Sequence, residues 1–440
     1  MLKHSTRQSD DQSLSAAKPS QQLWISAACP TVDHDTRPEY DVSSSGRPPL
    51  SPSCVGIMAA AGGIAVANLY YNQPMLPNIG RSFGVAADVV ALLPMLTQIG
   101  YAVGLFLFVP LGDVVDRSQL VSALLFGIIV SLVALALAPS LVWLDIASLT
   151  LGMMSAVVQV LVALAAQLSP PQYRGRIVGT VQAGILAGIL LARTVSGTVS
   201  AQFGWRPMFW LAAAMNLGVL VVLYRALRRT TPPAPKPYPC VLRSLRELWE
   251  SYPQLRTSSL IGALLFAAFS VFWSTLAFRL GEPPFGYGPQ VAGLFGLLGA
   301  AGATSAPLAG YLTDRRGPGF TVAAGTMATA TAFVVFMLAG SSLAMLALGV
   351  ILLDVGIQAA MNGNQSTVLS LAPQATSRTN TIYMVIYFVG GALGSYTGGL
   401  AWHHFGWQGT TALGLLYSCV AVLVRFIAWM PATAGVIKRA

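Results

Sequence analysis

The chain has 440 residues, of which 55% are hydrophobic and only 9% are charged. Soluble globular proteins carry roughly 25% charged residues, so this composition excludes a soluble protein and indicates one embedded in lipid. The formal net charge of +10 at pH 7 comes from basic loops, which suit an anionic bilayer surface. We therefore expect a lipid bilayer around the chain, and no nucleic acid as its partner.

Residues 1–52 precede the first apolar run. They are rich in Ser, Pro and mixed charge, including Asp33, Asp35, Glu39 and Asp41. A segment of this composition cannot bury enough apolar surface to fold, so we expect a disordered cytoplasmic tail. It lacks the basic start, apolar stretch and cleavage site of a signal peptide. A mis-assigned start codon is the alternative explanation for part of it.

Twelve apolar runs follow, each of about 20 residues, the length that crosses a bilayer core of roughly 30 Å. They begin near Val55, Val90, Leu120, Leu141, Val178, Pro207, Ser259, Val291, Phe320, Leu343, Ile382 and Thr410. The expected fold class is therefore an all-α membrane protein with twelve transmembrane helices.

Basic residues mark one side of the membrane. Alternate loops, the linker between the halves and the C-terminus carry most of them: Arg117, Arg174, Arg176, Arg225, Arg228, Arg229, Lys236, Arg243, Arg246, Arg256, Arg315, Arg316, Arg378, Lys438 and Arg439. The opposite loops carry only Arg81, Arg206 and Arg279. Because Lys and Arg in short loops stay in the cytoplasm, we expect a multi-pass protein of the cell (inner) membrane with both termini cytoplasmic.

The second half of the chain repeats marks of the first. Phe203-Gly204-Trp205 returns as Phe405-Gly406-Trp407, and Gly188 returns as Gly390, each 202 residues later. A repeat of this length fits two similar helix bundles related by an axis along the membrane normal, the plan of many secondary transporters. We expect bundles at 53–229 and 258–430, a cytoplasmic linker at 230–257 and a cytoplasmic tail at 431–440.

The linker joins a proline-rich spacer to an amphipathic pattern. Residues 232–237 read Pro-Pro-Ala-Pro-Lys-Pro, which favours a stiff, extended chain. Apolar residues then recur at helical spacing from Val241 to Trp249, with Arg243, Arg246, Glu247 and Glu250 on the other face. This pattern predicts a short helix on the inner membrane surface; an unstructured linker is the alternative.

Two loops carry related motifs. One reads Gly310-Tyr311-Leu312-Thr313-Asp314-Arg315-Arg316-Gly317, and its first-half copy runs from Leu111-Gly112-Asp113 to Asp116-Arg117. Both copies resemble the loop signature of the major facilitator superfamily, and the resemblance covers about residues 53–430. It implies two pseudo-symmetric six-helix bundles, and a latch on the inner gate formed by Asp113, Arg117, Gly310, Asp314, Arg315 and Gly317. Solvated turn aspartates beside arginines are the alternative.

Only Arg193 and Asp354 carry charge deep within the apolar runs. Arg193 replaces the proline of a glycine-rich motif that is typical of the family's antiporters. An unpaired charge at mid-membrane costs roughly 2.5 to 3.5 kcal/mol, and the similar depths of the two residues allow an ion pair between the halves. Our hypothesis is that Asp354 binds the coupling proton and that its contact with Arg193 alternates. A permanent structural pair, or separate local hydrogen bonds, is the alternative.

Other polar residues are candidates for the substrate cavity. The segment Asn68-Leu69-Tyr70-Tyr71-Asn72-Gln73-Pro74 resembles a segment of many bacterial members of the family. The complete set of candidates is Asn68, Tyr71, Asn72, Gln73, Gln159, Trp273, Asn362 and Gln365. Amides and aromatic rings suit a neutral or weakly polar organic solute, although such residues also bind neighbouring helices together.

No motif of an enzyme or metal site occurs. The chain lacks HExxH and P-loop sequences, and its four cysteines show no paired spacing, so we expect no enzyme, metal, cofactor or disulfide. The leading interpretation is a monomeric secondary transporter that exports small organic molecules in exchange for protons. Import of a sugar, nucleoside or carboxylate is the alternative. A membrane-embedded enzyme or sensor is the interpretation from another class.

Overall fold

The computed structural model describes residues 52–170, 172–226, 238–339 and 341–437. Residues 1–51 of the predicted N-terminal tail and the proline-rich spacer of the linker lie outside these ranges. All regular elements in the described ranges are helices, which confirms the all-α prediction.

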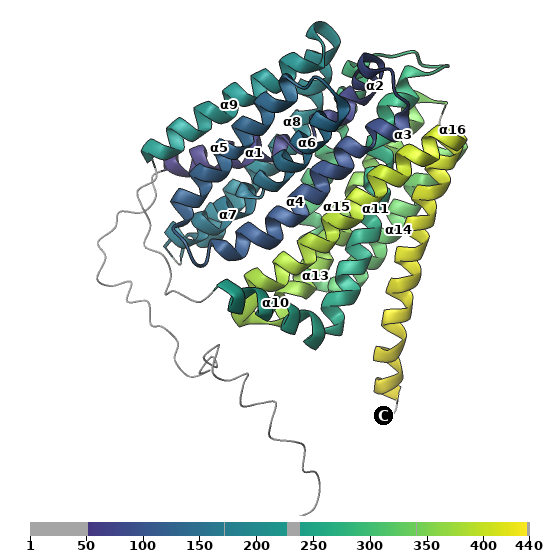
Figure 1. Ribbon diagram of the computed structural model, residues 1–440. Coiled ribbons are helices and arrows are strands. Elements are labelled where there is room, and N and C mark those ends of the chain that lie inside the picture. The colour runs from purple at the N-terminus through teal and green to yellow at the C-terminus, as the bar shows by residue number, and fades with distance from the viewer. Residues whose placement is uncertain (1–51, 171, 227–237, 340, 438–440) are drawn as a thin grey trace, which may run out of the picture. The chain divides into compact units, whose positions relative to one another are not determined.

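Nine helices form the first half, and a tenth follows them in the linker (Figure 1). They are α1 (Pro52–Ala67), α2 (Asn72–Phe83), α3 (Ala87–Val90), α4 (Leu92–Leu111), α5 (Arg117–Ala136), α6 (Leu141–Met154), α7 (Val157–Leu168), α8 (Arg174–Phe203), α9 (Trp205–Ala226) and the linker helix α10 (Tyr238–Ser251). The second half consists of α11 (Pro253–Gly281), α12 (Pro289–Leu298), α13 (Ala300–Arg316), α14 (Pro318–Ala339), α15 (Leu343–Leu371), the 3-10 turn η1 (Pro373–Ala375) and α16 (Thr376–Ile437).

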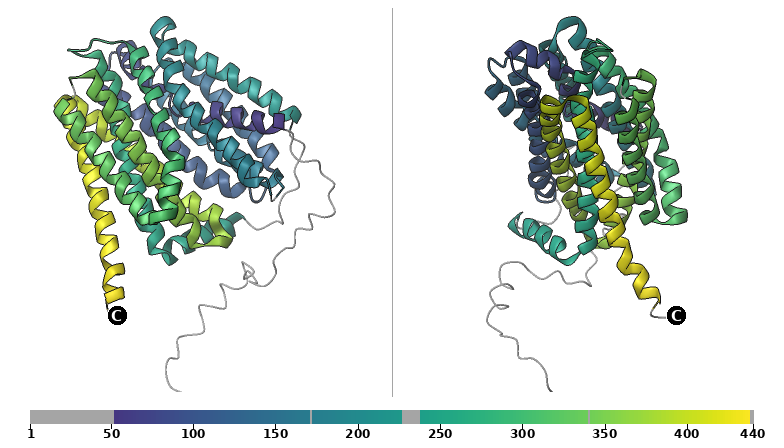
Figure 2. Two further views of the ribbon diagram at one scale, coloured as in Figure 1. Left: turned by 180° about the vertical axis from the view of Figure 1, so that it is seen from behind. Right: turned by 90° about the vertical axis from the view of Figure 1, so that its right-hand side faces the viewer.

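Eleven stretches of the described chain are long and apolar enough to cross a membrane. The last, Thr376–Ala428, has 53 residues, or about 80 Å at about 1.5 Å per residue, far more than a bilayer core needs. Gly406 interrupts it with φ 59° and ψ −148°, and the chain reverses there (Figures 1 and 2). The stretch therefore contains two spans, in agreement with the twelve predicted. Its helix continues to Ile437, past the point where we expected the tail to begin.

Several spans are divided into two helices. The first consists of α1 and α2, separated at residues 68–71. Pro74 explains this break, because its ring has no N–H and clashes with the carbonyl group four residues earlier. The second, fourth and eighth spans are likewise divided at Ala91, at Ser155-Ala156 and at Gly299. Such breaks place backbone and polar side chains at membrane depth, where they must find partners inside the protein.

Each half contains a close helix contact at the repeated glycine. Gly188 on α8 meets the backbone of Gly63 on α1, and a Cβ at Gly188 would overlap the carbonyl oxygen of Gly63. Its counterpart Gly390 on α16 meets the backbone of Ala263 on α11 in the same way. Small residues allow this approach, which drives helix association in lipid. The duplicated sequence thus produces duplicated packing.

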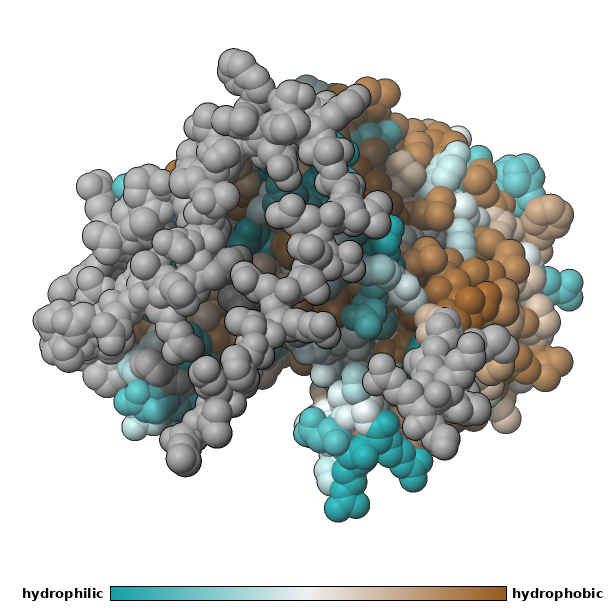
Figure 3. Space-filling view, turned by 90° about the horizontal axis from the view of Figure 1, so that it is seen from below, coloured by the Kyte–Doolittle hydropathy of each residue, from teal (hydrophilic) through white to brown (hydrophobic). Residues whose placement is uncertain are grey.

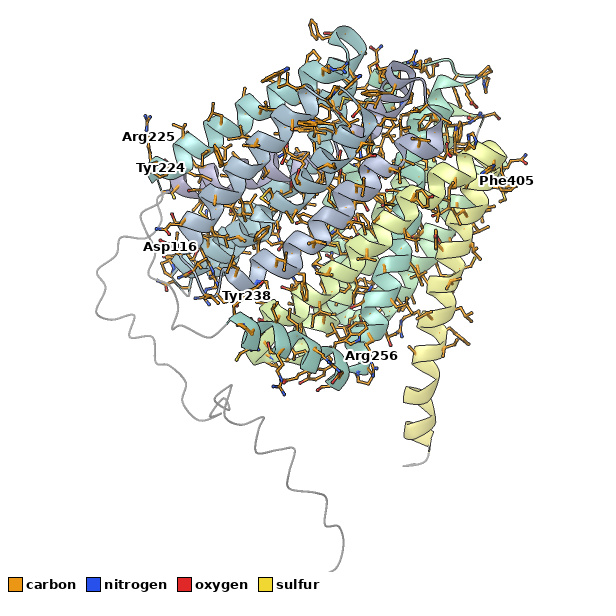
Figure 4. The ribbon with its side chains drawn as sticks, in the orientation of Figure 1. Asp116, Tyr224, Arg225, Tyr238, Arg256 and Phe405 are labelled. Carbon is orange, nitrogen blue, oxygen red and sulfur yellow. The ribbon has the colours of Figure 1, made fainter. Side chains whose placement is uncertain are left out.

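The two halves contact each other through α8 against α12 and through α3 and α4 against α16. Gln98 on α4 donates to the hydroxyl of Ser395 on α16 at 3.1 Å, and Thr194 on α8 donates to the carbonyl oxygen of Gly293 on α12 at 3.0 Å. Figure 4 shows Phe405 towards one end of the helices and Arg256 towards the other. By their place in the spans, both hydrogen bonds lie in the half of the bundle nearer Phe405.

Helix α10 lies near the opposite end, by the last turns of α4 (Figures 1 and 4). Its Tyr238 hydroxyl donates to the carbonyl oxygen of Leu107 on α4 at 2.8 Å, while Val241 and Leu245 are buried. The amphipathic helix therefore forms where its pattern predicts. Cys240 in α10 is disulfide-bonded, so the expectation of no disulfide is wrong.

Candidate functional site

A cavity of about 560 Å³ lies between the halves, at the end where Arg117 begins α5 and Arg174 begins α8. Its walls come from α4, α7 and α8 of the first half and from α15 and α16 of the second. Figure 3 views this end of the molecule, where hydrophilic residues are interspersed with hydrophobic ones. Its volume lies in the range of small-molecule sites.

Most of the polar residues that line the cavity carry amide or hydroxyl groups. Two predicted residues, Gln159 on α7 and Gln365 on α15, line it. We did not single out the others: Gln167, Gln182, Thr376, Ser377, Asn380 and Thr381. The sequence did contain one signal for these cavity residues, because several of them are polar and lie near the arginine-rich ends of the fifth and eleventh spans. Such positions resemble ordinary helix ends in sequence, and only the bundle shows which of them face inward.

The other six candidates lie away from this cavity. Asn68 and Asn216 exchange long amide hydrogen bonds of 3.5 and 3.4 Å, and Asn72 donates to the hydroxyl of Thr97 at 3.4 Å. These bonds join helices within the first half. Tyr71 is buried, and the amide of Asn362 donates to the carbonyl oxygen of Ala306 at 3.4 Å. Gln73 and Trp273 belong to a separate group around Arg193.

Arg193 lies in a box of aromatic rings and is only 1% exposed. Its Nε donates to Oε1 of Gln73 at 2.8 Å. The guanidinium carbon lies 3.9 Å from the ring centre of Trp273, 4.9 Å from Tyr70 and 5.6 Å from Phe269. Trp273 and Phe269 come from the second half, so this first-half cation is held across the interface. A desolvated cation–π contact contributes about 2 kcal/mol or more.

Asp354 on α15 does not form an ion pair with Arg193: the salt bridges of the described residues do not include these two. Its Oδ2 is buried without a hydrogen-bond partner among those residues. Glycines of the eighth span face it: a Cβ at Gly302 would lie 2.9 Å from the Asp354 Cβ, and one at Gly299 would lie 3.4 Å from Oδ2. The guanidinium of Arg193 is held instead by Gln73 and the aromatic rings. The ion pair that we expected from the similar depths of Arg193 and Asp354 is therefore absent in this conformation.

An aromatic layer separates the cavity from Arg193. It consists of Tyr101 on α4, Phe266 on α11, and Tyr387 and Phe388 on α16. Phe266 stacks on Tyr387 with ring centres 4.1 Å apart, and Tyr101 packs edge-on against Phe388 at 4.4 Å. The cavity residues Leu105 and Met384 stand one helical turn from Tyr101 and Phe388. Towards Arg193, Phe266 stacks on Phe269 at 5.6 Å.

The two loop motifs differ in their contacts. In the first, Arg117 pairs with Asp113 at 2.7 Å and donates to Oε1 of Gln167 on α7 at 2.9 Å. In the second, Arg315 lies over the ring of Tyr311 at 4.8 Å, and Gly317 ends α13 with φ 82°. Gly310 has no neighbour within 4 Å of the place its Cβ would occupy. The first motif thus ties its loop to α7, and the second packs locally beside Asp314.

We expect a double-mutant cycle between Arg193→Gln and Trp273→Leu to show a coupling of about 1 to 2 kcal/mol in the free energy of unfolding, because the buried contact is desolvated. Unfolding in mixed detergent micelles measures it. The matched control is Arg206 over Trp205, 4.2 Å apart but on an exposed residue, for which we expect about 0.5 kcal/mol. Equal coupling energies for the two pairs would contradict the conclusion that burial strengthens the contact between Arg193 and Trp273.

Two similar sets of membrane-spanning helices with a cavity between them are the plan of many secondary transporters. A family model described as Major Facilitator Superfamily matches residues 58–395. The chain belongs to this superfamily.

Named relatives support the assignment. The chain is 37% identical over 375 residues to the uncharacterized transporter YgaY of Escherichia coli O157:H7, covering 85% of this chain and 95% of that one. It is 24% identical over 371 residues to the multi-drug resistance efflux pump PmrA of Streptococcus pneumoniae, covering 80% and 91%.

The fold is also found among solved structures. A bacterial homologue of the human lysosomal transporter Spinster matches with a TM-score of 0.71 at 16% identity, covering 87% of this chain and 98% of that one. Its membership of the Major Facilitator Superfamily makes the chain a multi-pass membrane transporter with small-molecule substrates. Membership of a transporter family agrees with the expectation that it is not an enzyme.

Proposed function

We propose that the chain exports small organic solutes across the bacterial inner membrane in exchange for protons, by alternating access of its two six-helix halves. Both termini are cytoplasmic in this proposal. The observation that carries it is Asp354, an acidic side chain at mid-membrane whose Oδ2 is buried without a hydrogen-bond partner among the described residues. A carboxylate held there is costly, which favours a role in binding and releasing a proton.

The conformation fits a state that is open to the cytoplasm. The cavity lies at the end of the bundle marked by Arg117 and Arg174, and arginines in short loops favour the cytoplasmic side. At the other end the halves are joined by Gln98 with Ser395, and His403 Nδ1 lies 3.8 Å from Asp88 Oδ1. Opening to the outside would require these contacts to separate while the cavity closes.

Coupling would depend on the surroundings of Asp354. The charge of Arg193 reaches its carboxyl group, while Gly299 and Gly302 of the eighth span pack against it. Arg193 belongs to the first half, whereas Asp354 and two of the rings that hold Arg193 belong to the second. Separation of the halves at this level must therefore move the guanidinium relative to Asp354. The cost of ionising Asp354 would then differ between the two conformations, and this difference is what proton coupling requires.

Export is the direction supported by a cavity that loads from the cytoplasm and by the relationship to an efflux pump. Gln159 and Gln365 are the proposed substrate contacts, since both line that cavity. The remaining candidates of the first span would then act by supporting the helices and Arg193.

Purified protein in liposomes tests the proposal. Compounds that raise its unfolding temperature identify ligands, because specific binding stabilises the folded state by mass action. We expect these ligands to accumulate in vesicles with an acidic interior, and a protonophore to abolish the accumulation. For protein molecules whose cytoplasmic side faces the medium, protons then leave as substrate enters. Accumulation that is unchanged by the protonophore would refute proton coupling.

A further inference from the structure

The polar lining of the cavity has an unbalanced charge. It includes two guanidinium groups, those of Arg117 and Arg174, and none of the described residues that line it is acidic. The charge of Arg117 is already compensated, because Asp113 lies 2.7 Å away and Gln167 accepts a further bond. Arg174 has no such partner: the ion pairs of the described chain do not include it. Its charge is available to whatever enters.

Helix geometry directs Arg174 towards the cavity. Arg174, Val178 and Gln182 all line it and follow one another at intervals of four residues, which places them on one face of α8. Gln182 lies eight residues further along the helix, about 12 Å deeper at about 1.5 Å per residue. Arg176 is two residues from Arg174, so it points to a different face, and it does not line the cavity.

Neutral donors continue the site inward. Beyond Arg174 the wall presents the amides of Gln159, Gln182 and Gln365 and the hydroxyl of Thr381. Amide and hydroxyl groups donate hydrogen bonds to the oxygens of an anion. The carboxyl group of Asp354 does not line the cavity and lies beyond the aromatic layer. An anion bound here would therefore meet donors and no facing carboxylate.

We propose that this cavity selects organic anions that carry a carboxylate or a similar oxyanion, and that Arg174 is its specificity-determining residue. The inference rests on the proposed transport function and names its substrate class. A low-dielectric cleft with charge of one sign concentrates ligands of the opposite sign. The membrane potential, negative inside, also favours export of an anion by about 2.3 kcal/mol per 100 mV.

A separate proton site makes such export compatible with coupling. The anion would sit on the cavity side of Tyr101 and Phe388, while Asp354 lies beyond them. Substrate and proton then occupy different sites, so the anion can bind while Asp354 is ionised. The movement of the halves would then couple the two sites, and substrate and proton would not compete for one carboxylate.

The first experiment measures the charge of the cavity without knowledge of the substrate. Gln182→Cys, in a chain whose native cysteines are changed to serine, is reacted with methanethiosulfonates that carry a sulfonate or a trimethylammonium group. We expect the anionic reagent to react faster relative to the same pair on free cysteine, and Arg174→Gln to lower this ratio by about fivefold. Arg176→Gln, the matched control, removes the same charge from the same turn and should leave the ratio unchanged. A cavity that prefers the cationic reagent, or an equal fall in both variants, overturns the proposal.

The second experiment keeps the native cysteines, in case the cysteine-free chain does not fold. Naphthoate, naphthamide and naphthylmethylamine, together with the same three forms of a series of larger ring systems, are tested for binding and transport. We expect carboxylates to raise the unfolding temperature, and Arg174→Gln but not Arg176→Gln to weaken their binding about tenfold. Binding by no carboxylate, or preference for amides or amines, overturns the anion site.

The two proposals fail differently in these measurements. If amides or amines are carried by a pH gradient and carboxylates are not, the cavity is not an anion site and the proton-coupled exporter stands. If carboxylates bind through Arg174 but their flux does not depend on the pH gradient, the anion site is supported and proton coupling is refuted.

Discussion

Asp354→Asn is expected to abolish accumulation of substrate driven by a pH gradient, while exchange of labelled for unlabelled substrate continues. With one proton per substrate, each unit of pH difference sustains roughly a tenfold concentration ratio, since a tenfold ratio and one pH unit both correspond to about 1.4 kcal/mol. The amide cannot take up and release the proton, so the ratio should fall to about one. Measurement in proteoliposomes with the pH gradient set in each direction gives both quantities.

Asp145→Asn is the matched control for that variant. Asp145 lies in α6, within the fourth span, and it does not line the cavity. The substitution removes a carboxyl group of the same type, and we expect gradient-driven accumulation close to that of the unchanged protein. Accumulation by Asp354→Asn at the level of the unchanged protein would exclude Asp354 as the coupling residue, whatever the control shows.

Gly293→Leu is expected to produce the second large effect, a loss of most transport because the end of the bundle remote from the cavity cannot close. Gly293 on α12 packs against the backbone of Arg193 and the Cα of Gly197 on α8, and a Cβ there would overlap the Arg193 carbonyl oxygen. Backbone cannot move aside as a flexible side chain can, so a leucine must push the two halves apart.

The conformational shift can be measured directly. Cysteines placed at that end should become accessible to a membrane-impermeant thiol reagent in Gly293→Leu, while the cavity at the other end should become less accessible. Gly218→Leu on α9 is the control, since nothing lies within 4 Å of the place its Cβ would occupy, and it should transport normally. A Gly293→Leu protein that folds, transports normally and shows unchanged accessibility would contradict the assignment of this contact.

The repetition in the sequence predicted much of the fold, because it repeats the requirements of the backbone. Gly204 and Gly406 hold equivalent positions and both have positive φ, 86° and 59°, a region that favours glycine. Each lies where one span ends and the next begins. The breaks within spans were less accessible to prediction: Pro74 was visible, but the division at Gly299 depends on how the eighth span packs against its neighbours.

The candidate site was predicted only in part, because sequence fixes how deep a residue lies in a helix more readily than which neighbour it faces. Arg193 and Asp354 were recognised as the deep charges. Their similar depth suggested an ion pair, yet Trp273 and Gln73 hold the guanidinium. Gln159 and Gln365 line the cavity, whereas Asn68 and its neighbours bond within their own half. Rotation about the helix axis, set by packing across the bundle, decides between these outcomes.

If Asp354 binds the coupling proton, as we propose, the aromatic layer affects whether protons can leak through the protein. A chain of water molecules between the cytoplasm and Asp354 would let protons pass without substrate and dissipate the gradient. Tyr101, Phe266, Tyr387 and Phe388 are all buried, and their stacked rings join the two halves between the cavity and Arg193. They fill that path with apolar surface. In the proposed mechanism the layer would therefore block proton entry in this conformation until the movement that also carries the substrate.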